Sequence, residues 1–115
     1  MRSFPVAIAG SLILTTMMFA LPKPKTFRGE IMDDQCGEMG QHGVVANPLK
    51  DARECTIDCV RLGGKYVLFD PATRVPYGLD DQRSPEAFAG AKVEVTGTLD
   101  KMTRTIHVIE IHEAE

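Results

Sequence analysis

The stretch that decides the fold is KVEVTGTL, residues 92–99. Its apolar residues Val93, Val95 and Leu99 are separated by polar ones, which predicts a β-strand with one buried and one exposed face. Gly97 interrupts the buried row, as is typical where a strand bends strongly or lies close to another backbone. A short and strongly bent strand favours a small curved sheet or a partly open barrel.

Further strands are predicted on both sides of this stretch, at residues 26–32, 65–69, 75–79 and 105–111. Pro76 has no amide hydrogen for a strand ladder, so the strand around it is expected at an edge. In the last strand the apolar phase slips between Val108 and Ile109, which indicates a bulge or burial on both faces.

Helical spacing of apolar residues runs from Asp51 to Leu62, and the glycines at 63–64 end it. A short helix is predicted at 84–88, with a proline in its first turn. Residues 35–48 are rich in glycine and also contain Asn and Pro, so we expect a long loop there. Five strands with one main helix predict a mainly β fold of the α+β class.

The chain has 115 residues, 43% of them hydrophobic and 25% charged, which suits one small domain. Residues 1–21 combine Arg2 with an apolar stretch and a small residue, Ala20, before Pro22, as in a signal peptide. The apolar run is shorter than the roughly 20 residues of a membrane helix, so export is favoured over an N-terminal anchor and no stable membrane span is expected. We therefore expect a linker at 22–26, a domain at 27–112 and a periplasmic or extracellular location.

The formal net charge is −3, and the basic residues are scattered among acidic ones. A nucleic-acid-binding protein needs a concentrated basic patch, so nucleic acid is disfavoured as a partner. The sequence contains no nucleophile elbow, no H-E-x-x-H motif and no phosphate loop. A non-enzymatic protein is therefore favoured.

The three cysteines, at positions 36, 55 and 59, are the residues with the most distinctive chemistry. An odd number leaves at least one thiol unpaired in an oxidising compartment, unless all are metal ligands or a second molecule takes part. One interpretation is a disulfide from Cys36 to Cys55 or Cys59. It would tie the predicted loop to the helix and contribute roughly 3 kcal/mol to stability.

A second interpretation is a metal site, because Cys55 and Cys59 lie one helical turn apart on the same face. The predicted ligands are Cys36, His42, Cys55 and Cys59. Four such ligands suit tetrahedral zinc, and the three sulfurs alone suit Cu(I). Met32 and Met39 flank the loop and are soft enough to assist copper. The spacing matches no standard zinc finger.

Two further interpretations stay open. In one, the Cys55 and Cys59 thiols are redox-active, which requires a depressed thiolate pKa at the helix. In the other, the protein is an interaction module that binds a peptide or glycan, and the cysteines only form a staple. His107 and His112 are interpreted as surface or hydrogen-bonded histidines, and the acidic pairs at 33–34 and 80–81 as turn and helix-start devices.

A family resemblance rests on the motifs G-x-I-x-D-x-x-C-G at 29–37, C-x-x-x-C at 55–59 and A-G-x-K-V-x-V-T-G-T-L at 89–99, together with His42. These resemble an uncharacterised family of small secreted bacterial proteins, a domain of unknown function, over residues 27–111. The last section also resembles periplasmic OB-fold proteins. The resemblance implies a small five-stranded OB-like, partly open barrel. It also implies that the cysteines and His42 form a shared signature. The chain departs from the family pattern in a longer loop after His42 and in Asp34, where we expect Ser.

Overall fold

The computed structural model describes residues 2–5, 10–13, 22–40 and 51–115. Most of the predicted signal peptide and the candidate ligand His42 lie outside these residues. Within the described ranges, no helix is both long and apolar enough to cross a membrane.

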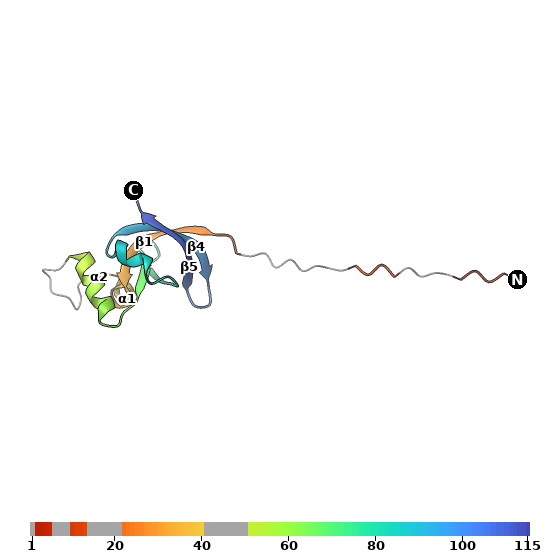
Figure 1. Cartoon of the computed structure of the whole chain (residues 1–115), viewed down its shortest axis with the longest axis horizontal. Coiled ribbons are helices and arrows are strands. Elements are labelled where there is room, and N and C mark those ends of the chain that lie inside the picture. The colour runs from red at the N-terminus through yellow and green to blue at the C-terminus, as the bar shows by residue number, and fades with distance from the viewer. Residues whose placement is uncertain (1, 6–9, 14–21, 41–50) are drawn as a thin grey trace.

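The described residues form a five-stranded barrel. Figure 1 shows its strands with helices beside them. Its strands are β1 (Lys25–Asp33), β2 (Tyr66–Asp70), β3 (Val75–Leu79), β4 (Lys92–Asp100) and β5 (Thr105–Glu113). They are ordered β1-β2-β3-β5-β4, and β4 pairs back onto β1. Only the β3–β5 pair is parallel, and its register holds just Gly78–Thr105 and Leu79–Ile106. The prediction of a mainly β, α+β fold with a small five-stranded barrel is confirmed, and the ring of strand pairs is closed.

Strand bending closes this small barrel. β1 pairs with β4 along its first part and with β2 along its last part, and Glu30 has a partner in each. In the β4–β5 pair, Thr96 lies opposite Glu110 and Gly97 opposite Val108, so one residue of β5 is extra. This is the predicted bulge. A Cβ atom on Gly97 would collide with the carbonyl oxygen of His107, which confirms the expected close approach of two backbones.

The helices differ in one respect from the prediction. α2 (Ala52–Arg61) and the 3₁₀ helix η1 (Ser84–Phe88) lie where helices were expected, but Asp34–Met39 forms a short helix, α1. The prediction of a loop from residue 35 was therefore wrong for these residues. Gly37 lies inside α1, where a Cβ atom would be 2.7 Å from a methyl carbon of Val67, and Gly40 ends the helix with a φ of 69°. The glycines that indicated a loop serve close packing and helix termination.

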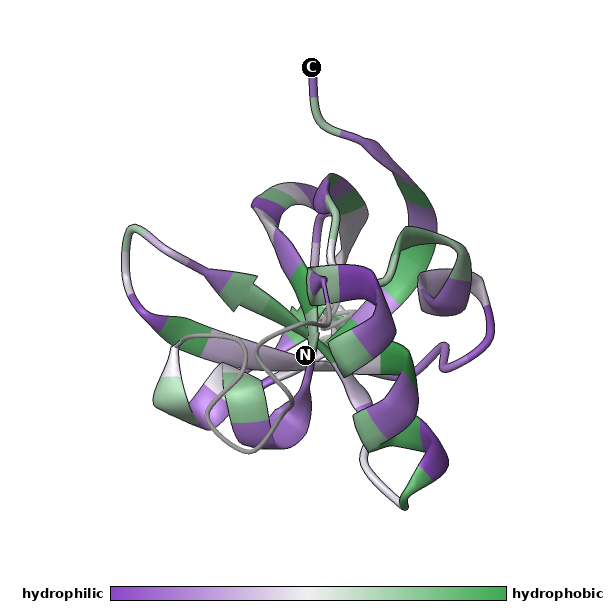
Figure 2. Cartoon of the chain, turned by 90° about the vertical axis from the view of Figure 1, so that its left-hand side faces the viewer, coloured by the Kyte–Doolittle hydropathy of each residue, from purple (hydrophilic) through white to green (hydrophobic). Residues whose placement is uncertain are grey.

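Two groups of buried side chains stabilise the domain. The main core fills the barrel and consists of Ile31, Tyr66, Leu68, Leu79, Ala89, Val93, Val95 and Ile106. Figure 2 shows hydrophobic strand segments meeting in the middle of the barrel, with more hydrophilic helix surfaces around them. The second group contains Met32, Cys36, Cys55, Val67 and Phe69, with Cys59 packed against it. It includes residues of α1, α2, β1 and β2, and it holds all three cysteines.

Candidate functional site

The second buried group is rich in sulfur, and we call Met32, Cys36, Cys55 and Cys59 the sulfur cluster. Met32, Cys36 and Cys55 are 3%, 3% and 2% exposed, while Cys59 is half-buried. None of the three cysteines forms a disulfide. Val67 and Phe69 supply the apolar wall on the β2 side. The fold thus brings sulfur atoms from β1, α1 and α2 into one largely water-free region.

Cys55 and Cys59 are held in place because α2 is anchored at its start. Asp51 caps the helix by accepting a hydrogen bond from the Glu54 amide at 2.8 Å. The Arg53 side chain donates to backbone oxygens of η1, including that of Ala87 at 3.3 Å. Gly90, with a φ of 75°, lies so close to the backbone at residues 52–53 that a Cβ atom would be 2.6 Å from it. α2 therefore packs against the η1–β4 connection, and its cysteine face meets β1.

Asp33 begins α1 and positions Cys36. Its Oδ2 atom accepts a hydrogen bond from the Cys36 amide at 3.2 Å, which is an N-cap interaction. Its side chain is fully buried, and in the described part of the chain its Oδ1 atom has no hydrogen-bond partner. Unpartnered buried carboxylate oxygens are uncommon because they lose hydration without compensation. The acidic pair at 33–34 thus starts a helix, as predicted, but Asp33 also adds an uncompensated buried group beside the sulfur cluster.

Cys59 is the cysteine most open to solvent. A cavity of about 280 Å³ connects it with Asp33 and is also lined by the turn at 62–64. Burial raises the pKa of the Cys59 thiol, and the negative charge of Asp33 and the neighbouring Cys55 thiol raise it further. Cys55 also shares a side-chain hydrogen bond with Cys59. A raised pKa is the opposite of what the redox interpretation requires, because an attacking thiol must be deprotonated.

The structure brings Cys36, Cys55 and Cys59 together, whereas His42 lies outside the described residues. In the described part of the chain, no three side chains of the types His, Cys, Asp and Glu are arranged to hold a metal ion as they stand. Met39, the other flanking methionine, is 40% exposed and is not part of the cluster, whereas Met32 is. The sequence predicted Asp33 as a turn and helix-start residue and gave no sign of a place beside the cysteines. Its N-cap position was visible in the sequence, but its proximity to Cys59 depends on how α2 packs.

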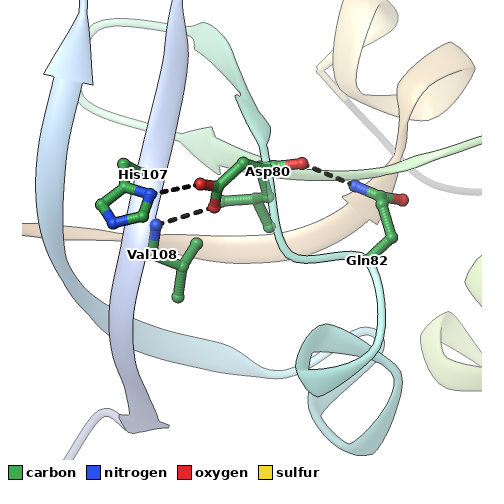
Figure 3. A network of polar contacts seen from close by, with 5 residues as sticks. Asp80, Gln82, His107 and Val108 are labelled. Carbon is green, nitrogen blue, oxygen red and sulfur yellow. Dashed lines mark hydrogen bonds and ion pairs between the residues drawn. The ribbon is translucent and has the colours of Figure 1, made fainter.

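His107 and Asp80, the first residue of the second acidic pair, form polar contacts within the fold. Figure 3 shows Asp80 accepting hydrogen bonds from the His107 ring at 2.5 Å and from the Val108 amide at 2.8 Å. The Val108 amide and the His107 side chain hold the pKa of Asp80 below its usual value. Nearby, Gln82 donates to the carbonyl oxygen of Leu79 at 3.0 Å. The group ties the start of the β3–η1 connection to β5, and the His107 side chain is 70% exposed.

The geometry can be compared with known proteins. No family, curated protein or solved structure matches this chain. The functional argument therefore rests on the sulfur cluster itself.

Proposed function

We propose that this chain is an exported, non-enzymatic OB-like module that binds a soft transition-metal ion, Cu(I), at the sulfur cluster. The observation that carries the proposal is the gathering of Met32, Cys36, Cys55 and Cys59 in one buried group between the barrel and its two α-helices. The barrel serves as the scaffold and supplies Met32 from β1, and α1 and α2 supply the three cysteines.

The kind of donor favours copper over zinc. Thiolate and thioether sulfur are the ligands that Cu(I) prefers, and Cu(I) accepts a small number of them. Structural zinc needs four ligands in a tetrahedron. Cys55 and Cys59 already contact each other through a hydrogen bond, and Met32 adds a thioether in the same group. Zinc would require rearrangement of these side chains and the addition of His42.

The surroundings suit storage of reduced thiols. Oxidation and disulfide exchange both proceed through the thiolate form of cysteine. The raised pKa of Cys59 therefore slows both reactions. Each cysteine that binds copper as a thiolate releases its proton to solvent. The cavity at Cys59 gives the ion a path to the cluster, and the buried side chains of Val67 and Phe69 pack against the other side of the cluster.

A disulfide is the second candidate for the same residues. Cys36 and Cys55 come from different helices and are both buried in one group, so a bond between them would join α1 to α2. Such a bond removes two copper ligands. The two states are therefore mutually exclusive, and the redox condition of the sample selects between them.

The test is a titration of the reduced full chain with Cu(I) under anaerobic conditions, in competition with the coloured chelator bicinchoninate. We expect about one equivalent of copper bound tightly, and loss of that binding in Cys55→Ser and Cys59→Ser. Met32→Leu keeps the volume but removes the thioether, and should weaken binding about tenfold. Met102→Leu is the matched control, because Met102 is 95% exposed in the β4–β5 turn.

Less than about half an equivalent of bound copper, with a native disulfide found by mass spectrometry, would contradict the proposal and support the staple. Full copper binding by Cys55→Ser and Cys59→Ser would contradict it as well, because the ion would then be held elsewhere.

A further inference from the structure

A second cavity among the described residues lies away from Cys55 and Cys59, where β1 exchanges one neighbouring strand for another. Its volume is about 530 Å³, within the range of small-molecule pockets. The exposed residues Pro71 and Ala72 of the turn at 71–74 line it on one side, and the almost fully buried Met32, Phe69 and Val93 lie at its base. This space is large enough for the hydrophobic body of a small ligand.

Backbone packing keeps this pocket open. Gly29 lies against the Phe69 carbonyl, where a Cβ atom would collide, so β1 and β2 meet without side chains at this point. Gly40 lies in the same way against the Arg74 guanidinium group. Arg74 itself adopts a φ of 57° in the β2–β3 turn and places its guanidinium carbon 5.6 Å from the centre of the Phe69 ring. Turn geometry and this cation–π contact therefore hold Arg74 at the pocket.

The charges around the pocket single out Arg74. Arg28 is already paired with Glu94 at 3.0 Å. Lys92 lies opposite Glu30 in the β1–β4 register, so its charge is partly offset. The Asp70 carboxylate accepts the Ala72 amide at 2.9 Å.

Arg74 has no such offset. In the described part of the chain no carboxylate is within ion-pairing distance of it, and residues 41–50 contain no Asp or Glu. Among the described residues Lys92 also has no ion pair, but it lies opposite Glu30, so Arg74 is the better placed of the two cations for an anionic ligand.

We propose that this pocket binds a small amphipathic anion, with its apolar body between β1 and the turn at 71–74 and its carboxylate or sulfonate on Arg74. A guanidinium group is suited to this task because its planar set of N–H donors matches the two oxygens of a carboxylate. Lys92 contributes a weaker attraction from the β4 side. The pocket shares Met32 with the sulfur cluster, so its ligand binding is measured on copper-free protein.

The test uses the fluorescent amphipathic anion 8-anilinonaphthalene-1-sulfonate with the full chain, and its displacement by decanoate. We expect Arg74→Gln to weaken binding of both anions about tenfold, and Arg74→Lys to retain most of it. Lys92→Gln should weaken it less, because of the facing Glu30. 1-Decanol, which has the chain without the charge, should displace the probe far less well than decanoate.

The fold supplies a matched control. Arg104 occupies the corresponding position of the β4–β5 turn, with a φ of 56°, and that turn contains the same Asp-to-amide hydrogen bond, at 2.9 Å from Met102 to Asp100. Arg104 does not line this pocket. Arg104→Gln should therefore leave probe binding unchanged, with a melting temperature like that of Arg74→Gln. The proposal would be overturned if Arg74→Gln and Arg104→Gln bound the probe equally well, or if 1-decanol displaced the probe as effectively as decanoate. It would also be overturned if neither anion bound.

Discussion

Replacement of Asp33 by Asn should separate the stability of the domain from the chemistry of its thiols. Asn caps helices about as well as Asp, so its side-chain oxygen can keep the hydrogen bond to the Cys36 amide. The substitution removes the negative charge from a fully buried side chain whose second oxygen has no partner in the described part of the chain. A buried, unsatisfied polar group costs about 1–3 kcal/mol, and more if it is charged.

The amide that replaces the carboxylate also loses hydration, so we take the lower part of that range. Asp33→Asn should raise the free energy of unfolding of the copper-free protein by about 1 kcal/mol. For a domain of this size, that corresponds to an increase in melting temperature of about 4–8 °C. The pKa of Cys59 should move down toward its ordinary value, because the Asp33 charge helps to raise it. The reduced variant should therefore be alkylated faster at neutral pH than the reduced wild type.

The assays are thermal unfolding by circular dichroism and the pH dependence of iodoacetamide alkylation, both under reducing, metal-free conditions. Asp51→Asn is the matched control, because Asp51 also caps a helix but is exposed. Asp51→Asn should change neither the melting temperature nor the pH dependence of alkylation appreciably. A lower melting temperature for Asp33→Asn, or an alkylation profile identical to that of the wild type, would refute the reasoning about this buried carboxylate.

Three further outcomes test the fold and its electrostatics. Ile31→Ala should lower the free energy of unfolding by about 2–5 kcal/mol in chemical denaturation, because Ile31 is fully buried. Ile109→Ala should lower it by less than about 0.5 kcal/mol, because Ile109 is 58% exposed. Similar losses in the two variants would contradict the assignment of the barrel core. Gly97→Ala should destabilise the domain by about 3 kcal/mol and speed amide hydrogen exchange in β5, because the added methyl group collides with the His107 carbonyl oxygen. Wild-type stability of this variant would show that β4 and β5 do not meet closely at Gly97. The lowered pKa of Asp80 stabilises the fold above the unfolded-state pKa, near about 4, and this contribution is lost as the pH falls through the folded-state pKa. Asp80→Asn should therefore lower the melting temperature at neutral pH and match the wild type at about pH 2, and an equal deficit at both values would exclude a role of the charge.

The strands were predictable because their signals are local. Alternation of apolar and polar residues identified strands such as 92–99, a continuous apolar run identified 65–69, and the phase slip at residues 108–109 indicated the bulge. α1 was missed because Gly37 and Gly40 normally interrupt helices. The first allows close packing on Val67 and the second ends the helix, and both reasons depend on contacts absent from the local sequence.

The two candidate sites likewise combine features visible in the local sequence with features that depend on packing. Spacing placed Cys55 and Cys59 on one helix face, but the burial of Asp33 beside them depends on the packing of α2. The pocket at Arg74 had no sequence signal. It arises where β1 changes partners and where a turn residue with positive φ stacks on Phe69, and both are products of the barrel geometry.

X-ray absorption at the copper edge, on the full chain loaded with one equivalent of Cu(I), tests the proposed function most directly. Sulfur atoms should dominate the inner coordination shell, and this signal should weaken in Cys55→Ser and Cys59→Ser and stay unchanged in Met102→Leu. A shell made only of nitrogen and oxygen atoms, or a sulfur signal that persists in both cysteine variants, would show that the sulfur cluster does not hold the ion.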